Sequence, residues 1–412
     1  MNELSTTSPQ PVKAKERIII LDILRGFALF GVLFANLLTW SGLKYLPFED
    51  IIRLGNFEDD REIYHIMKFF VDTKFYTLFS ILFGVGFFLQ ISKNRDNSTF
   101  PGLYLWRMLL LLIIGVVHSI IWSGDILSLY ALMGMTLLAL RNIPVQKTLT
   151  VGLSLFFLPV LLSVIYMFAF AKDLPMLPKT ALLVYPDMTP QEVKAGFQST
   201  DIGVVLQTNL HSLKYRWLSF IPDGRPLKVL GLFFIGGYLY SINFFTVHAK
   251  KWKLMILFFV IGAIFTSISV KIEGVVASYS RNWIDIIDKL FHEIGQLSLT
   301  LSYICMLTKL VDVFPKFKLF TWMKNYGRMS MTSYLGHTLL SILFFYPVVG
   351  VGLGYFGIMT LEKTYYFAVI VLVFQLLFSN IWFRYFAFGP IEWAWRCAAY
   401  RKWFPITIKK VQ

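Results

Sequence analysis

Long apolar segments recur from one end of this sequence to the other. A helix crosses the hydrocarbon core of a bilayer with about 20 mostly apolar residues. Ten segments qualify: 18–40, 69–91, 103–122, 126–140, 149–170, 227–246, 254–272, 291–310, 329–346 and 365–388. Only 15% of the 412 residues are charged, against about 25% in soluble domains. The sequence therefore predicts an all-α membrane protein, a polytopic bundle of about ten transmembrane helices, and excludes disordered, fibrous and most soluble folds.

Basic residues are distributed unevenly between the connections. If the N-terminus lies inside and each segment crosses once, 21 Lys and Arg fall on inner connections and 7 on short outer ones. Cytoplasmic loops carry such an excess. The pattern predicts a multi-pass protein of the cell membrane with both termini in the cytoplasm. It also explains most of the net charge of +15 through contact with membrane lipid, so no nucleic acid is expected as a partner.

The connection 171–226 divides the apolar segments into two sets of five. We expect an N-terminal half at 18–170 and a C-terminal half at 227–396, with a disordered tail at 1–17 and a basic tail at 397–412. Both tails are predicted to be cytoplasmic and the long connection extracytoplasmic.

One interfacial helix is expected inside the long connection, over residues 190–220. Thr189 can cap it, and Glu192 supplies a negative charge in its first turn. Long ordered loops are commonly functional, and this one could form a lid over an outward-facing site.

Cofactor motifs are absent from the sequence. Cys305 and Cys397 are the two cysteines, which excludes a disulfide scaffold or a thiolate metal site. There is no glycine-rich nucleotide loop, no His-Glu-x-x-His and no Gly-x-Ser-x-Gly. We therefore expect no metal and no permanently bound cofactor.

Ionisable groups inside the first segment are candidate functional residues, because each costs at least about 2.5–3.5 kcal/mol at a helix centre. Asp22 and Arg25 are three residues apart and share a helix face. They form either an internal ion pair or, with Gly26 permitting close approach, an anion site. Asn36 lies eleven residues after Arg25 on the same face. A single Asn in a membrane helix commonly makes an interhelical hydrogen bond.

His118 and Asp125 flank a short turn between the third and fourth segments. Such a hairpin brings the two side chains close together. A carboxylate orients an imidazole and raises its basicity, which favours a general base. The alternative is a structural histidine with satisfied hydrogen bonds.

Further candidates lie in the C-terminal half. Glu293 opens the eighth segment, and His337 is in the middle of the ninth as a second base or a polar crosslink. Arg384, Glu392 and Arg396 gather at the inner end of the tenth. Glu392 and Arg396 are spaced as an i,i+4 pair, which favours a structural cap.

These residues divide into two sets. The inner set is cationic, and the outer or mid-membrane set is polar. The inner set is Arg25, Lys324, Arg328, Arg384 and Arg396, and the outer set is Asn36, His118, Asp125, Glu293 and His337. A basic inner mouth suits a phosphate-bearing donor, and a His–Asp site suits proton abstraction from a hydroxyl.

Several motifs resemble the YeiB-like family of uncharacterised bacterial multi-pass membrane proteins. They are LDILRGFALFGVLFAN, KFYTLFSILFGVGF, RMLLLLIIGVVHSIIWSGDILSLYALMG, GRMSMTSYL and FGPIEWAWR. Together they cover nearly the whole chain.

The first motif also resembles a wider superfamily of transmembrane acyltransferases. Its members start with Asp-x-x-Arg-Gly and place a His or Asn ten residues after the Gly, which corresponds here to Asp22, Arg25, Gly26 and Asn36. The polysaccharide enzymes carry the His, proposed as catalytic. This chain carries Asn36, as the lysosomal heparan enzyme does, so His118 is the substitute candidate. The family often has Gln at the position of His337.

Three functions remain open from the sequence. The first is an acyltransferase that uses cytoplasmic acyl-CoA as a cosubstrate, with phosphates met by Arg25 and Arg328 and a glycan or lipid acceptor deprotonated by His118. Asp125 would orient His118, and Asn36 would donate to the developing oxyanion. The second is a secondary transporter, and the third is a non-catalytic receptor or assembly factor.

Overall fold

The computed structural model describes residues 18–46, 48–55, 57–170, 188–275 and 283–408. This part of the chain is built from α-helices with short 3₁₀ and π turns, and its one β-bridge joins Phe386 to Thr407. The α-helices are α1 (Ile19–Trp40), α2 (Phe48–Leu54), α3 (Phe57–Phe70), α4 (Lys74–Lys93), α5 (Phe100–Ile121), α6 (Leu127–Ala139), α7 (Thr148–Phe170), α8 (Pro190–Phe197), α9 (Ile202–Asp223), α10 (Arg225–Ser241), α11 (Trp252–Val275), α12 (Trp283–Val313), α13 (Lys318–Arg328), α14 (Ser330–Phe345), α15 (Leu361–Trp382) and α16 (Pro390–Tyr400). The predicted tail at 1–17 and the start of the long connection lie outside the described residues.

Every predicted apolar segment overlaps one of these helices. Seven helical stretches are long and apolar enough to cross a membrane, and they include α1, α4, α5, α7, α11, α12 and α15. Helices α6, α10 and α14 are shorter, with 13, 17 and 16 residues. The predicted all-α membrane protein is confirmed, and seven of the ten predicted segments meet the length criterion.

The short helix α10 is central rather than peripheral. Its residues from Lys228 to Gly237 are all buried. A Cβ on Gly236 would lie 2.2 Å from the Ile81 carbonyl oxygen of α4, and one on Gly231 would lie 2.6 Å from the Gly152 carbonyl oxygen of α7. These glycines therefore let α10 pack tightly between two longer helices.

Helices α1 and α13 cross at a second glycine contact. A Cβ on Gly26 would lie 2.2 Å from the Met323 carbonyl oxygen, and one on Gly327 would lie 1.9 Å from the Asp22 carbonyl oxygen. Gly26 thus permits the close approach of a neighbouring helix. The crossing places Arg25 and Arg328, the neighbours of these glycines, at the same level of the bundle.

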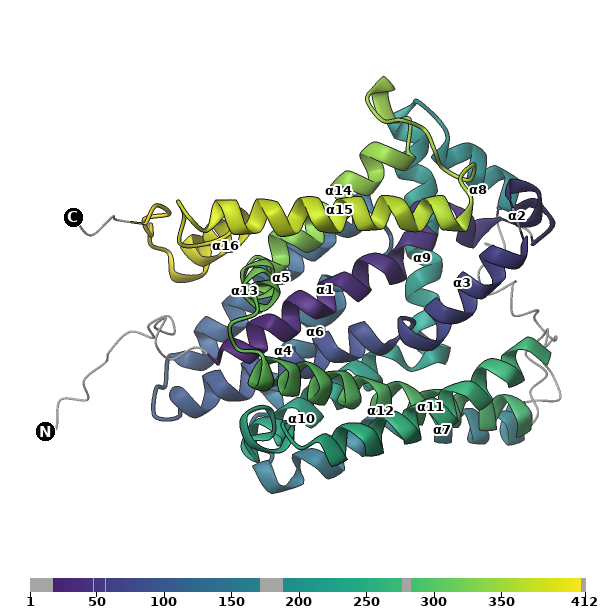
Figure 1. The fold of residues 1–412 in the computed structure, drawn as a ribbon. Coiled ribbons are helices and arrows are strands. Elements are labelled where there is room, and N and C mark those ends of the chain that lie inside the picture. The colour runs from purple at the N-terminus through teal and green to yellow at the C-terminus, as the bar shows by residue number, and fades with distance from the viewer. Residues whose placement is uncertain (1–17, 47, 56, 171–187, 276–282, 409–412) are drawn as a thin grey trace, which may run out of the picture.

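The two ends of the bundle carry different elements. In Figure 1, α1 begins and α15 ends at the same end, where α16 also lies, whereas α2, α3 and α8 gather at the opposite end. The chain therefore leaves α1 at the same end at which it enters α15, as it does when the segments between these two helices cross the bundle an even number of times. We refer to the end with α16 as the inner end and to the other as the outer end, following the predicted sidedness.

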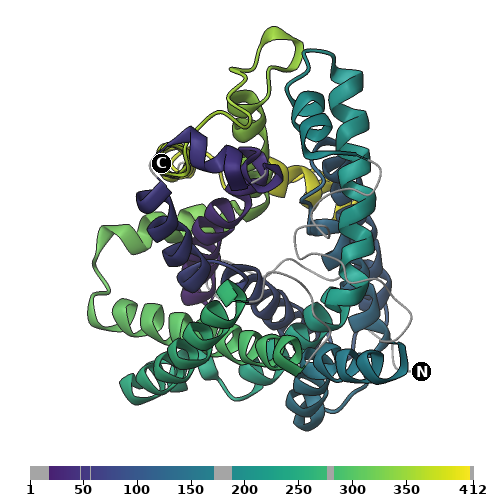
Figure 2. The same cartoon turned by 90° about the vertical axis from the view of Figure 1, so that its right-hand side faces the viewer.

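The expectation of a single helix over residues 190–220 is wrong. Two helices, α8 and α9, are separated by a turn in which Asp201 accepts from the Gly203 amide at 2.7 Å and caps α9. The predicted cap at Thr189 does start α8, and the structure adds that Glu192 completes a capping box with it. Helix α9 lies across the outer end of the bundle and not along it (Figures 1 and 2).

Candidate functional site

His118, Asp125 and Thr338 form a hydrogen-bonded chain between α5, the α5–α6 turn and α14. His118 Nδ1 lies 2.8 Å from Asp125 Oδ1, and His118 Nε2 lies 2.9 Å from Thr338 Oγ1. All three residues are buried. A carboxylate only accepts, so Nδ1 carries the proton, and in the neutral imidazole Nε2 accepts from the Thr338 hydroxyl. A base held between an orienting carboxylate and a hydroxyl is the arrangement of nucleophilic catalysis.

The position of Asp125 follows from the start of α6. Its carboxylate accepts from the Leu127 amide at 3.1 Å and from the Ser128 amide at 2.8 Å. These amides are among the unpaired donors of a helix N-terminus. Asp125 is therefore fixed by α6 while it orients His118.

Aromatic rings enclose the imidazole. The ring centroids of His118 and Tyr334 are 5.2 Å apart, and those of His118 and Trp122 are 5.7 Å apart. Trp122 in turn stacks on Trp40 of α1 at 4.5 Å. The Tyr334 and Trp122 rings help to shield the buried imidazole from bulk solvent, which strengthens its polar contacts.

A second polar cluster occupies another face of α14. The Tyr326 hydroxyl lies 2.7 Å from His337 Nε2 and donates to Gln375 Oε1 at 2.9 Å. All three side chains are buried. His337 therefore crosslinks α13, α14 and α15. This is the arrangement expected of a polar crosslink.

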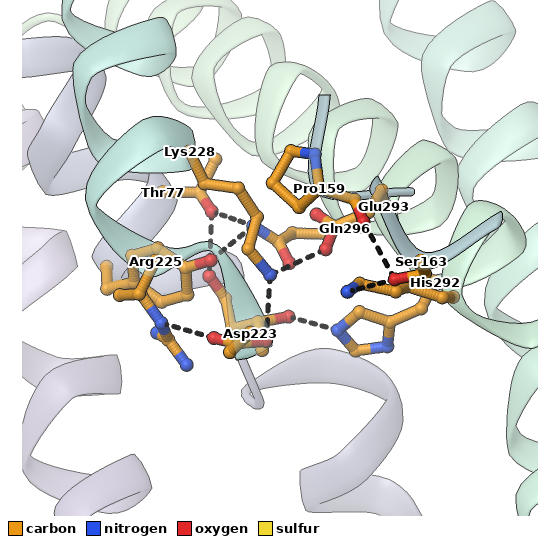
Figure 3. Close-up of polar contacts among 12 residues, drawn as sticks. Thr77, Pro159, Ser163, Asp223, Arg225, Lys228, His292, Glu293 and Gln296 are labelled. Atoms are coloured by element: carbon orange, nitrogen blue, oxygen red, sulfur yellow. Dashed lines mark hydrogen bonds and ion pairs between the residues drawn. The ribbon is translucent and has the colours of Figure 1, made fainter. Parts of the chain in front are cut away.

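Glu293 belongs to a separate charged cluster, shown in Figure 3. Lys228 Nζ lies 2.7 Å from Glu293 Oε1 and 3.0 Å from Asp223 Oδ1, and Arg225 Nε lies 2.9 Å from Asp223 Oδ2. Gln296 extends the cluster by donating to the hydroxyl groups of Tyr76 and Thr77. The cluster ties α12 to α4 and to the α9–α10 junction.

Charge neutralisation explains how these groups tolerate burial. The side chains of Lys228 and Glu293 are 4% and 1% exposed, and buried charges persist when they are paired. Burial alone would raise the pKa of Asp223, but Arg225 and Lys228 outweigh it and hold that pKa below its usual value. Gly224, at φ +63°, allows the sharp turn that brings the three groups together.

Two members of the predicted inner set, Arg25 and Arg328, are held by internal contacts. Arg25 pairs with Asp22 at 2.7 Å, as one of the two alternatives predicted. Arg328 donates to the Ala387 carbonyl oxygen at 3.1 Å. Arg25 and Arg328 lie at one level, whereas the Arg384 side chain is exposed.

Helix α16 closes the inner end. Glu392 accepts from the Met331 and Thr332 amides at 2.7 and 3.0 Å and so caps the N-terminus of α14. The Arg396 guanidinium lies 4.5 Å from the centre of the Phe388 ring. These contacts agree with the structural cap predicted for this group.

Asn36 is half-buried, and within the described part of the chain its side chain makes no hydrogen bond. The structure does not bring it into contact with His118. Its predicted role as an oxyanion donor therefore stays a prediction.

Together, the apolar helices and the buried polar clusters define a polytopic α-helical membrane protein. Residues 239–402 match the family described as "Protein of unknown function (DUF418)". The chain is 29% identical to the uncharacterized protein YxaH of Bacillus subtilis over 98% of its own length and 99% of the relative. It is 26% identical to the uncharacterized protein YeiB of Escherichia coli, over 92% of this chain and 96% of the relative. These matches support the YeiB-like family, and that prediction is confirmed.

Sequence reasoning missed several residues of these clusters. Thr338 is 220 positions from its partner His118, so no local spacing could reveal the contact. Lys228, near the start of the predicted segment 227–246, was not among the candidates, although Glu293 signalled that a buried cation had to lie nearby. Tyr326 and Gln375 carry no signal beyond being polar within apolar surroundings.

Proposed function

We propose that this protein transfers an acyl group from acyl-CoA to a hydroxyl-bearing acceptor, with His118 as the general base. The observation that carries the proposal is the chain from Asp125 through His118 to the hydroxyl of Thr338, at 2.8 and 2.9 Å. The membrane location and the predicted relationship to acyltransferases are consistent with it.

The reaction follows from the position of the imidazole. An acceptor hydroxyl that replaces Thr338 at Nε2 would give its proton to His118 as its oxygen attacks the thioester carbonyl. The carbon–sulfur bond then breaks, and the departing CoA thiolate takes the proton from the imidazolium. Asp125 stabilises the cation between these steps. General-base catalysis of this kind contributes about 10²–10⁴-fold.

The inner end would receive the CoA moiety. Arg25 and Arg328 lie at one level beside the α1–α13 crossing, where phosphate groups entering from the cytoplasm would meet them. Arg25 is already paired with Asp22, so a phosphate would share this guanidinium with the carboxylate.

A secondary transporter is the second candidate. The buried pair of Lys228 and Glu293 supports it, because ionisable residues inside membrane bundles commonly mark ion or substrate pathways. Transport predicts solute flux into vesicles that depends on Glu293 and not on His118.

The proposal is tested by measuring the rate at which purified protein in nanodiscs releases the CoA thiol from acetyl-CoA and from longer acyl-CoAs. We expect His118→Ala to reduce the rate by about 10²–10⁴-fold and Asp125→Asn to reduce it less. The control, His337→Gln, should retain most of the rate because this histidine serves packing. No thioester turnover by the wild type, or equal turnover by His118→Ala, would refute acyl transfer by this site.

Thr338→Val separates two routes within this mechanism. If the acceptor takes the place of Thr338, the Val variant keeps turnover. If Thr338 itself carries the acyl group, the variant is inactive and mass spectrometry of the wild type detects an acylated Thr338.

A further inference from the structure

Three buried donors beside His118 lack a hydrogen-bond partner among the described residues. They are Trp40 Nε1, Trp122 Nε1 and the Tyr334 hydroxyl. Buried donors are almost always paired. The Trp122 and Tyr334 rings contact the imidazole and Trp40 stacks on Trp122, so the three donors belong to one aromatic cluster beside His118. A group of unpaired donors in one place indicates an acceptor atom supplied by a ligand.

Arg216 of α9 adds a positive charge to this region. Asn209, on the same helix, accepts from the Ser123 amide at 2.6 Å and donates to the Ser119 carbonyl oxygen at 3.0 Å. It thereby fixes α9 against the α5–α6 turn that carries His118 and Asp125. Arg216 follows Asn209 by seven residues, two helical turns, and so lies on the same face of α9. The guanidinium of Arg216 is within electrostatic range of both Tyr334 and Asp125.

No carboxylate in the described part of the chain forms an ion pair with Arg216. Its guanidinium packs 5.2 Å from the centre of the Phe220 ring, and its buried Nε has no hydrogen-bond partner among the residues that the structure describes. Arg225 also packs against Phe220, at 5.9 Å, but it is paired with Asp223. The two arginines thus differ: Arg225 is neutralised within the protein, and Arg216 is available to an anion.

Lys44, just beyond the outer end of α1, is a second cation of this region. No carboxylate of the described residues lies within ion-pair distance of it, and Asp72 acts on it only from further away. The Lys44 side chain is accessible, yet enough protein surrounds it to lower its pKa to about 8, through loss of hydration and through Arg216. The guanidinium and this ammonium group together supply two positive charges. A phosphate monoester, with close to two negative charges, matches them better than a single carboxylate does.

We propose that Arg216, Lys44 and the hydroxyl of Tyr334 form a subsite for a phosphate group at the outer end of the bundle, beside the His118–Asp125–Thr338 chain. The phosphate is part of the acceptor, so the acceptor role depends on the proposed acyl transfer, whereas the binding itself does not. Helix α9 brings the guanidinium to the site, the end of α1 brings the ammonium group, and α14 brings both Tyr334 and Thr338.

Direct binding measurements test this subsite without turnover. Purified protein in phosphatidylcholine nanodiscs is titrated with glycerol 3-phosphate and with inorganic phosphate, and in a parallel arm the nanodiscs contain phosphatidic acid and native mass spectrometry counts retained lipid. We expect Arg216→Gln to weaken phosphate binding at least about 10-fold, the effect of losing a bidentate charged contact. Tyr334→Phe should weaken it less.

Lys214→Gln is the matched control, because it removes the same charge from an exposed position on the same helix. It should leave affinity unchanged. Preference for glycerol 3-phosphate identifies a soluble acceptor, and preference for phosphatidic acid identifies a lipid headgroup. Absence of binding in both arms, or equal binding by wild type and Arg216→Gln, overturns the subsite. The His118→Ala variant distinguishes the two proposals. If it is catalytically inactive but still binds phosphate, phosphate binding does not depend on acyl transfer, and each proposal can fail without the other.

Discussion

Removal of the Lys228 ammonium group should destabilise the bundle more than most single substitutions. Lys228→Met leaves Glu293 with no cation at 2.7 Å, in a position where its carboxylate is 1% exposed. Breaking a buried pair by removing one partner costs about 3–5 kcal/mol. Whole domains are commonly stable by only about 5–15 kcal/mol, so the variant should lose a large part of its folding free energy.

Glu293→Gln should cost less, because Lys228 keeps Asp223 at 3.0 Å. In the double variant Lys228→Met/Glu293→Gln no unpaired charge remains at Glu293, and much of the loss should be recovered. Purified protein is unfolded with increasing SDS, and tryptophan fluorescence follows the transition. This assay gives the free energy of unfolding of each of the three variants. Lys271→Met, at an exposed position, is the control. If Lys228→Met is as stable as the control, or if the second substitution recovers nothing, the pair does not stabilise the fold as argued.

Three further predictions concern packing, capping and sidedness. Gly327→Ala should destabilise by about 1–3 kcal/mol because its methyl group meets the backbone of α1 at 1.9 Å, whereas Gly102→Ala meets nothing within 4 Å and should be neutral in the same unfolding assay. Glu392→Ala removes the cap of α14 at a cost of about 0.5–2 kcal/mol, and hydrogen exchange should show faster exchange of the first amides of that helix only. In a cysteine-free background, an impermeant thiol reagent added to intact cells should label Gln191→Cys and not Lys402→Cys. Labelling of Lys402→Cys and not of Gln191→Cys would show that the predicted topology is inverted.

The sequence was most informative where the physical signal is local. Apolar length predicted the helices, and a short turn was enough to predict that His118 and Asp125 meet. The division of the 190–220 region was missed because Asp201, a helix-capping residue, was taken as part of a continuous helix. Partners that come from distant segments, such as Thr338 for His118, depend on how α14 packs against α5. That packing is set by the summed fit of many side chains and not by any one pattern.

Glu392 is another residue whose partner lies in a distant segment and could not be predicted from local spacing. Its i,i+4 spacing to Arg396 predicted a local cap, and its carboxylate does cap a helix, but the helix is α14. Free amides at a helix start attract a carboxylate whichever segment supplies it. The spacing within α16 therefore predicted that Glu392 acts as a cap, but it did not predict that the capped helix is α14.

Helix α14 links the cap supplied by α16 to the site around His118. Its 16 residues span about 24 Å. Glu392 caps its first turn, and Thr338, at the middle of the helix, lies 2.9 Å from the imidazole of His118. A small rotation of this helix would move its hold on His118 and its hold on Gln375 together, since consecutive residues face the two clusters. A change in the contact between Glu392 of α16 and the first turn of α14 would therefore also move the Thr338 hydroxyl that meets His118.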